Sequence, residues 1–299
     1  MQDFSPQDFS LMQYGAMSSQ VFKDGILNGA VAIVTGGGSG IGSATARELG
    51  RLGATIVIAS RKSDRIKAAA AGLSDEIGAT VDGIATDIRD RDAVDHLVAA
   101  TMERHGRIDI LVNNGGGQFF SPAQFITPNG FDAVVATNLT GTWNLTQSVA
   151  NAWMLENGGG RIINITMNTH RGFPGMAHSV AARAGVEGMT KTLAVEWAFA
   201  NIQVNCIQPG VIASSGLRNY PDAQNMVRQA QQQIPAKRLG TVDEIAWAVA
   251  YLASPAGHYI TGQTLTVDGG RSHWGDTWPI PDPEPMPEWS IPVEPWEEQ

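Results

Sequence analysis

The chain has 299 residues, of which 43% are hydrophobic and 16% are charged, proportions typical of a globular protein with a full core. Its formal net charge of −9 argues against nucleic acid and anionic membrane surfaces as partners, because both are bound by basic faces. The single cysteine, Cys206, excludes an internal disulfide framework and a metal site built from several cysteines.

The pattern along the chain alternates between strand and helix. Apolar, β-branched runs predict buried strands over residues 31–36, 55–60, 108–114, 161–166, 202–210 and 264–270. Intervening stretches such as 44–53 and 242–254 have the composition of helices. This alternation predicts a single α/β domain over residues 26–271, a Rossmann-type doubly wound parallel sheet with helices on both faces.

The two ends of the chain differ from this domain in composition. Residues 1–25 are expected to form a polar extension, without the form of a signal peptide. Residues 272–299 are rich in proline, tryptophan and acids, which favours an extended arm packed on a neighbouring subunit over a solvating tail. No apolar run reaches the length of a membrane-spanning helix, and the C-terminus is not a peroxisomal address. The expected location is therefore the cytoplasm.

The stretch "TGGGSGIG" (35–42) follows the first predicted strand and precedes a helix. Gly36 permits the tight turn, and Gly40 and Gly42 allow the close backbone approach that places a pyrophosphate at a helix N-terminus. The alternative is a merely flexible turn. The flanking strand and helix favour the phosphate-binding interpretation.

The end of the second predicted strand indicates which dinucleotide is bound. A fold that prefers NAD usually places an acid there, whereas this chain has Ser60, Arg61 and Lys62. A guanidinium pairs with a 2′-phosphate, so we expect NADPH as cofactor with Arg61 on that phosphate. The alternative is that Arg61 is a solvated surface charge. Asp87 is placed to accept a hydrogen bond from the adenine amino group.

Four spaced motifs resemble those of the short-chain dehydrogenases/reductases: "TGGGSGIG", "NNGGG" (113–117), "NLTGT" (138–142) and "PGVI" (209–212). The longer stretches "GFPGMAHSVAARAGVEGMTKTLAVEWA", "IPAKRLG" and "ITGQTLTVDGGRS" are similar to the trans-2-enoyl-CoA reductase branch, a neighbour of the 2,4-dienoyl-CoA reductases. The resemblance implies an NADPH-dependent reduction of a carbon–carbon double bond conjugated to a thioester. It also implies a homotetramer.

Transferred position by position, the resemblance implies a cofactor-binding set that runs from the phosphate loop to the nicotinamide carboxamide. It comprises Gly36, Ser39, Gly40, Ile41 and Gly42 along the pyrophosphate, Ser60 and Arg61 at the 2′-phosphate, Asp87 and Ile88 beside adenine, Asn114, Gly115 and Arg183 at the nicotinamide ribose, and Pro209, Ile212 and Ser214 beside the carboxamide.

The catalytic positions depart from the family pattern. The helix "AHSVAARAGVEGMTK" (177–191) lacks the Tyr-x-x-x-Lys pair, because the tyrosine aligns with Ser179 and the lysine with Arg183. The catalytic serine aligns with Thr166, which keeps a hydroxyl, and Asn138 matches the asparagine that holds a catalytic water. Ser179 is a much weaker acid than a phenol, and an arginine cannot relay a proton. Ketone reduction is therefore disfavoured.

Conjugate reduction needs donors aimed at a developing enolate oxygen, and Thr166 and Ser179 can supply them without ionising. The α-carbon proton is expected from a water held by Asn138, or else from His178 or His170. Two alternatives are an NADP(H)-dependent carbonyl reductase or alcohol dehydrogenase with an atypical site, and a catalytically inactive scaffold that binds the cofactor. No metal site is expected. The basic candidates for an acyl-CoA phosphate are Lys237, Arg238, Arg171 and Arg218.

Overall fold

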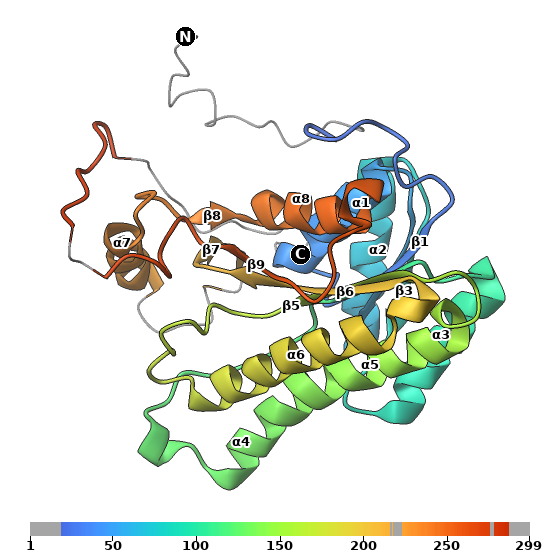
Figure 1. Ribbon diagram of the computed structural model, residues 1–299, viewed down its shortest axis with the longest axis horizontal. Coiled ribbons are helices and arrows are strands. Elements are labelled where there is room, and N and C mark those ends of the chain that lie inside the picture. Colours follow the sequence, from blue (N-terminus) through green and yellow to red (C-terminus); the bar gives the residue numbers. More distant parts are fainter. Residues whose placement is uncertain (1–18, 216, 218–222, 276–277, 287–299) are drawn as a thin grey trace.

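The computed structural model describes residues 19–215, 217, 223–275 and 278–286. Seven parallel strands form one sheet in the order β3-β2-β1-β4-β5-β6-β9 (Figure 1), and two short strands, β7 and β8, pair separately. The strands of the large sheet are β1 Val31–Thr35, β2 Thr55–Ser60, β3 Val81–Ala85, β4 Ile110–Asn113, β5 Gly160–Ile165, β6 Ile202–Pro209 and β9 Thr264–Val267. The predicted doubly wound fold is confirmed.

The helices cover both faces of this sheet, as Figure 1 shows. One hydrophobic core joins the sheet to α1, α2 and α8, and a second joins it to α3, α5 and α6. The α-helices are α1 Gly40–Arg51, α2 Ser63–Ile77, α3 Arg91–His105, α4 Pro128–Val135, α5 Gly141–Val149, α6 Ala177–Glu196, α7 Ala223–Gln233 and α8 Val242–Ala253. Shorter elements are β7 Ile212–Ala213, β8 Gly240–Thr241, η2 Ala123–Phe125, η3 Ala136–Thr140, η4 Ala150–Met154, η5 Ala198–Ala200 and η7 Pro255–Gly257.

Local chemistry explains where several helices begin and end. The Asp90 carboxylate accepts from two backbone N–H groups at the start of α3, and Thr241 and Glu244 form a capping box at the start of α8. Helices α2 and α3 end at Gly78 and Gly106, both left-handed, which a glycine adopts without strain.

Strand β3 was not among the predicted strands. Val81 is buried, the next three residues are half-buried and Ala85 is exposed, and the strand includes Asp82 and Gly83, so it lacks the continuous apolar run of the central strands. It lies at the edge of the sheet, where one side of the strand has no neighbour. The other predicted strands all form, with ends that differ by a few residues.

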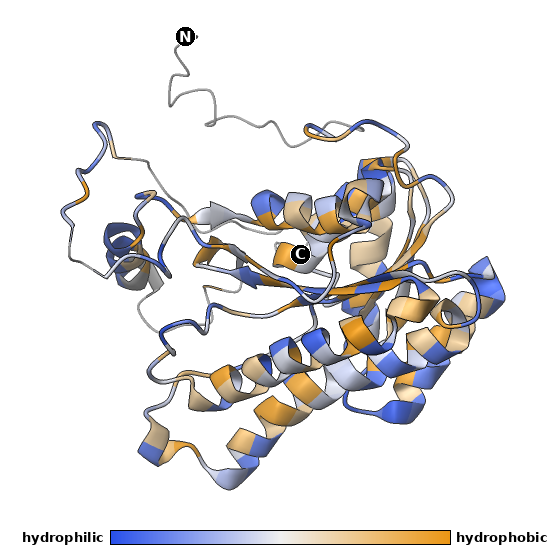
Figure 2. Cartoon of the chain, in the orientation of Figure 1, coloured by the Kyte–Doolittle hydropathy of each residue, from blue (hydrophilic) through white to orange (hydrophobic). Residues whose placement is uncertain are grey.

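The carboxyl ends of the parallel strands meet at one edge of the sheet, where ligands bind in folds of this kind. Helices α4, α5 and α6 lie together below the sheet in Figure 1, whereas α7, β7 and β8 extend to one side. Figure 2 shows hydrophobic and hydrophilic residues interleaved along α5 and α6, whereas α7 is mainly hydrophilic. Among the described residues, no helix is long and apolar enough to span a membrane.

Candidate active site

The loop between β1 and α1 is tightly closed by its own backbone. Gly36 and Gly40 have φ values of 65° and 53°, which are left-handed conformations that favour glycine. The Gly36 N–H donates to the Ala59 carbonyl at 2.7 Å. A Cβ on Gly42 would overlap the Gly36 carbonyl oxygen and lie 2.5 Å from Asn114 Nδ2. Gly42 therefore has no room for a side chain where α1 approaches the loop.

Helix α1 begins directly after this loop and carries no acid in its first turn. Ser39 precedes it with an extended backbone and makes no side-chain cap, and Ile41 packs against the core. Backbone N–H groups of a first turn attract anions, and an acid there would compete. These residues fit the pyrophosphate of a dinucleotide. Ser214 lies near the loop, its Cβ 3.7 Å from the position of a Cβ on Gly40.

Two guanidinium groups lie around one carboxylate at the carboxyl ends of β2 and β3, where the sequence predicts the adenosine of the cofactor. Asp87 accepts hydrogen bonds from Arg89 Nε at 2.9 Å and Arg89 Nη2 at 2.5 Å. The hydrogen bond from Arg89 lowers the pKa of Asp87, and the positive charge of Arg61 adds to the effect. Ser60 is half-buried at the end of β2, and Arg61 is exposed beside it. Arg61 therefore lies close enough to Asp87 for its charge to act on that carboxylate, and Arg89 is a further partner that the sequence did not indicate.

Ile88 links this end to the centre of the site. Its side chain packs against both Gly115 and Gly141, since a Cβ on Gly115 would lie 3.4 Å from Ile88 Cδ1 and one on Gly141 would lie 2.7 Å from Ile88 Cγ1. Asn114 holds the same segment to the phosphate loop by donating from Nδ2 to the Thr35 carbonyl at 3.0 Å. Asn114 and Gly115 therefore lie against Gly36, and their backbone is fixed there.

Asn138 and Arg183 form the polar centre of the site. Asn138 is buried in η3, a π-helical turn between α4 and α5, a type of irregularity often found at functional sites. Its Oδ1 accepts from Gly117 N–H at 3.1 Å and from Arg183 Nη2 at 3.3 Å, and its Nδ2 donates to the Gly117 carbonyl at 2.9 Å. Arg183 also donates from Nη1 to the Ile165 carbonyl at 2.7 Å. The guanidinium is held in place by neutral oxygens.

The two candidate oxyanion donors have different partners. The Thr166 hydroxyl donates to the Ile207 carbonyl at 3.2 Å, and the Ser179 hydroxyl lies 3.4 Å from Met167 Sδ. Thr166 follows β5, and Ser179 lies in the first turn of α6 and is fully buried. A thioether is a poor hydrogen-bond acceptor, so the Ser179 hydroxyl loses only a weak hydrogen bond when it turns toward a better acceptor.

The two candidate histidines lie in different environments. His178 is fully buried, and its Nδ1 accepts the Ser179 N–H at 2.8 Å, so the neutral ring carries its proton on Nε2. Nε2 has no hydrogen-bond partner among the described residues, and Phe119 covers the ring edge-on at 4.4 Å. His170 is exposed in the loop between β5 and α6. A role for His178 in proton transfer would require Phe119 to move.

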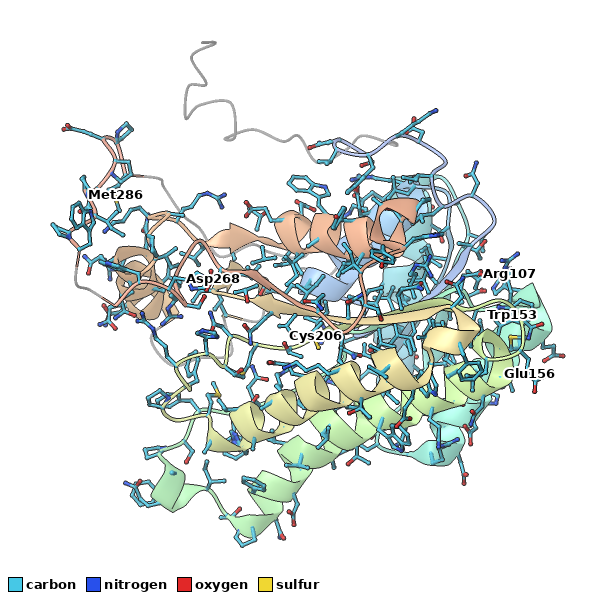
Figure 3. The ribbon with its side chains drawn as sticks, viewed as in Figure 1. Arg107, Trp153, Glu156, Cys206, Asp268 and Met286 are labelled. Carbon is cyan, nitrogen blue, oxygen red and sulfur yellow. The ribbon has the colours of Figure 1, made fainter. Side chains whose placement is uncertain are left out.

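Two polar contacts of this region were not expected from the sequence. Asn168 donates to Asp268 Oδ2 at 2.7 Å, which ties the loop after β5 to the end of β9 (Figure 3 labels Asp268). Burial acts to raise the pKa of Asp268, but hydrogen bonds from Ser272 and Gly270 outweigh it and hold that pKa below its ordinary value. In the sequence, the acid followed by two glycines at a strand end, "VDGG" (267–270), was the feature that could have indicated this contact of Asp268.

Glu187 takes part in a second contact of the same loop. It accepts hydrogen bonds from Thr169 Oγ1 at 3.2 Å and from Gln208 Nε2 at 3.0 Å.

Cys206 is buried in β6, where desolvation raises the pKa of its thiol to about 12. It is therefore an inert core residue and not a nucleophile.

The residues predicted beside the nicotinamide carboxamide lie at the same edge of the sheet. Pro209 ends β6, and Ile212 is buried in β7 beside it. Arg218 lies outside the described residues. Among the residues that the structure describes, no group of three or more histidine, cysteine or acidic side chains could hold a metal ion.

The chain belongs to the short-chain dehydrogenases/reductases, in the family described as enoyl-(acyl carrier protein) reductase, whose sequence model matches residues 36–272. A peroxisomal 2,4-dienoyl-CoA reductase of Danio rerio is 36% identical over 267 residues, which cover 89% of each chain. A probable 2,4-dienoyl-CoA reductase of Bacillus subtilis is 34% identical and covers 83% of this chain and 98% of its own.

Solved structures agree with this assignment. A citronellol catabolism dehydrogenase of Pseudomonas aeruginosa superposes with a TM-score of 0.76 at 40% identity, over 85% of this chain and 99% of that one. The resemblance inferred from the four motifs is therefore confirmed, and the family is one of oxidoreductases that use a nicotinamide cofactor.

Proposed function

We propose that the protein uses NADPH to reduce a carbon–carbon double bond conjugated to a thioester, as an enoyl-CoA or dienoyl-CoA reductase. One observation carries the proposal. The helix that should present a phenol and a lysine presents the Ser179 hydroxyl and a guanidinium held by the Asn138 and Ile165 oxygens. Such a site can stabilise an oxyanion, but it lacks the usual acid for an alkoxide. The relatives named 2,4-dienoyl-CoA reductases support the same reaction class.

When bound, the reduced nicotinamide supplies a hydride to the β-carbon of the substrate. Negative charge then develops on the thioester oxygen, where Thr166 and Ser179 would donate hydrogen bonds. For this, Thr166 must turn from the Ile207 carbonyl and Ser179 from the Met167 sulfur. Arg183 keeps its charge and orients Asn138, and it would hold the ribose hydroxyls of the bound cofactor.

The α-carbon proton would come from a water bound by Asn138. The Oδ1 of Asn138 accepts two hydrogen bonds and its Nδ2 donates one, which leaves one amide N–H for a water. Protonation of carbon after hydride addition needs no strong acid at the enolate oxygen. The lack of a phenol is therefore compatible with turnover.

The proposal is tested by offering the purified protein NADPH with crotonyl-CoA, a 2,4-dienoyl-CoA and acetoacetyl-CoA. We expect oxidation of NADPH with the enoyl or dienoyl thioester and little with the ketone. Reduction of the ketone alone would instead support a carbonyl reductase. Tight NADPH binding without oxidation by any acceptor would support an inactive scaffold, and both of these results contradict the proposal.

The preference for NADPH is assigned to Arg61, which lies with Asp87 at the adenosine end of the site. Because a hydrogen bond to a charged group contributes about 1.5–3 kcal/mol, we expect Arg61→Ala to raise the KM for NADPH by roughly ten- to a hundredfold. The KM for NADH should change little, since NADH lacks the 2′-phosphate. Lys67→Ala removes an exposed positive charge from the following helix, α2, and serves as the control. An unchanged ratio of the two KM values would refute the role of Arg61.

We also propose that the protein is a homo-oligomer, most simply a tetramer. Large apolar side chains are exposed on η2, α4, α5, α6 and η5, namely Phe125, Phe131, Trp143, Val195 and Phe199. Burial of exposed apolar side chains of this size against another subunit would stabilise an oligomer. Sedimentation of wild type and of Phe199→Asp tests this, since a single monomeric species for the wild type would exclude it.

The remaining proposals concern organisation and location. We propose that residues 26–271 form the catalytic domain and that the enzyme acts in the cytoplasm, which agrees with a single buried free thiol. Fractionation of cells that express the tagged protein tests the location. Recovery of the protein with peroxisomes or another organelle would contradict it.

A further inference from the structure

Two loops at the carboxyl edge of the sheet bring four basic side chains together. The loop after β5 carries His170 and Arg171, and the segment after β9 carries Arg271 and His273. The two histidine rings lie 6.0 Å apart, edge to face. Arg171 Nη2 is 3.5 Å from the position that a Cβ on Gly275 would take. The hydrogen bond between Asn168 and Asp268 fixes one loop against the other.

The described residues offset only part of the positive charge of this basic cluster. Asp268 lies beside it, but its oxygens already accept hydrogen bonds from Asn168 Nδ2 and from the backbone N–H groups of Gly270 and Ser272. Burial lowers the pKa of Arg271, and the nearby positive charge of Arg171 acts in the same direction while Asp268 opposes it. Two guanidiniums held close together attract an anion that can contact both.

Two other basic groups near this edge, Lys237 and Arg238, have carboxylate partners. Lys237 is buried, forms an ion pair with Asp282 at 2.9 Å, and lies 5.6 Å from the centre of the Trp274 ring. Arg238 forms an ion pair with Glu244 at 2.6 Å. The "IPAKR" segment, a candidate for phosphate binding in the sequence, is thus neutralised by the chain itself. The described part of the C-terminal arm packs on its own subunit at Lys237.

The position of the cluster indicates which molecule would supply the anion. The loop that carries His170 and Arg171 joins Thr166 at the end of β5 to Ser179 at the start of α6, the two hydroxyls assigned to the substrate. The adenosine end of the cofactor site lies at β2 and β3, and in the sheet order β1 and β4 separate these strands from β5. An anion at the cluster therefore belongs to the substrate side of the site, away from the adenosine of the cofactor.

We propose that His170, Arg171, Arg271 and His273 form a binding site for an anionic group of the thioester substrate, either a phosphate of coenzyme A or a carboxylate at the far end of the acyl group. The proposal rests on the proposed function, because it takes the substrate to be an acyl thioester. Both sources present oxygen anions that arginine binds with paired hydrogen bonds. They differ in which part of the substrate reaches the cluster.

Steady-state kinetics with three enoyl thioesters distinguish the sources. The substrates are crotonyl-CoA, crotonyl-pantetheine, which has no phosphate, and an enoyl-pantetheine whose acyl chain ends in a carboxylate. Arg171→Gln and Arg271→Gln are compared with Lys67→Gln, an exposed change of the same charge on α2. Because a hydrogen bond to a charged group contributes about 1.5–3 kcal/mol, we expect each arginine variant to raise the KM of the anionic substrate roughly ten- to a hundredfold with little change in kcat.

Each pattern of results has a definite meaning. A rise in KM for crotonyl-CoA but not for crotonyl-pantetheine identifies the phosphate, and a rise confined to the carboxylated pantetheine substrate identifies the carboxylate. Equal effects on all three substrates, or none, would overturn the proposal. If no thioester is reduced at all, the proposed function fails. Calorimetric titration of coenzyme A and of glutarate into the same proteins then tests the site without turnover, and binding unaffected by Arg171→Gln would exclude it.

Discussion

Removing the two candidate oxyanion donors should abolish most of the turnover while leaving cofactor binding intact. Loss of a single such donor typically costs about a hundredfold or more in rate, so we expect Thr166→Val and Ser179→Ala each to lower kcat by about that factor. Both side chains are buried, and their hydroxyls now bond only to the Ile207 carbonyl and the Met167 sulfur. The Kd for NADPH, measured by fluorescence, should stay within a factor of about two to three.

The control for this pair is Thr192→Val, because Thr192 lies on the exposed side of α6 and donates to the Gly188 carbonyl within the helix. Its kcat should equal that of wild type. Retention of full activity in the Thr166→Val, Ser179→Ala double variant would show that neither hydroxyl faces the developing charge. The proposed chemistry would then lack its main support.

A single methyl group in the phosphate loop should have the largest effect on cofactor binding. In Gly42→Ala the new Cβ would overlap the Gly36 carbonyl oxygen and lie 2.7 Å from the Gly36 carbonyl carbon, so the loop or the helix must move. Forced overpacking costs about 1–3 kcal/mol, and each lost charged hydrogen bond to phosphate costs about 1.5–3 kcal/mol more. We expect the Kd for NADPH to rise by at least about a hundredfold.

Gly38→Ala is the matched control in the same loop. A Cβ there would lie 3.5 Å from Ile66 Cδ1 and 3.7 Å from Ala69 Cβ, which are ordinary contacts, and Gly38 is not in a left-handed conformation. Calorimetry of NADPH binding to both variants compares them directly. Similar affinities for Gly42→Ala and Gly38→Ala would mean that the tight approach of α1 to the loop is not needed for the cofactor.

The α/β fold and the glycine turn after β1 could be predicted from the sequence, because both depend on local patterns. Runs of β-branched residues predicted the central strands, and the glycines at 36, 40 and 42 marked the turn that brings α1 to the end of β1. The replacement of the expected phenol by Ser179 could also be read directly, since it needs only the spacing within one helix. Edge strand β3 was not predicted, because it mixes apolar residues with Asp82 and Gly83.

The hydrogen-bond and ion-pair partners of the polar side chains could be identified from the three-dimensional structure but not from the sequence. Lys237 pairs with Asp282 and not with a ligand, and the ring of His178 is enclosed behind Phe119. The basic cluster forms because the loops that carry Arg171 and Arg271 lie side by side. The hydrogen bond that joins these loops links Asn168 to Asp268, which are 100 residues apart in the sequence. Such contacts form between loops whose relative positions are set by packing of the whole sheet, and no local pattern in the sequence encodes them.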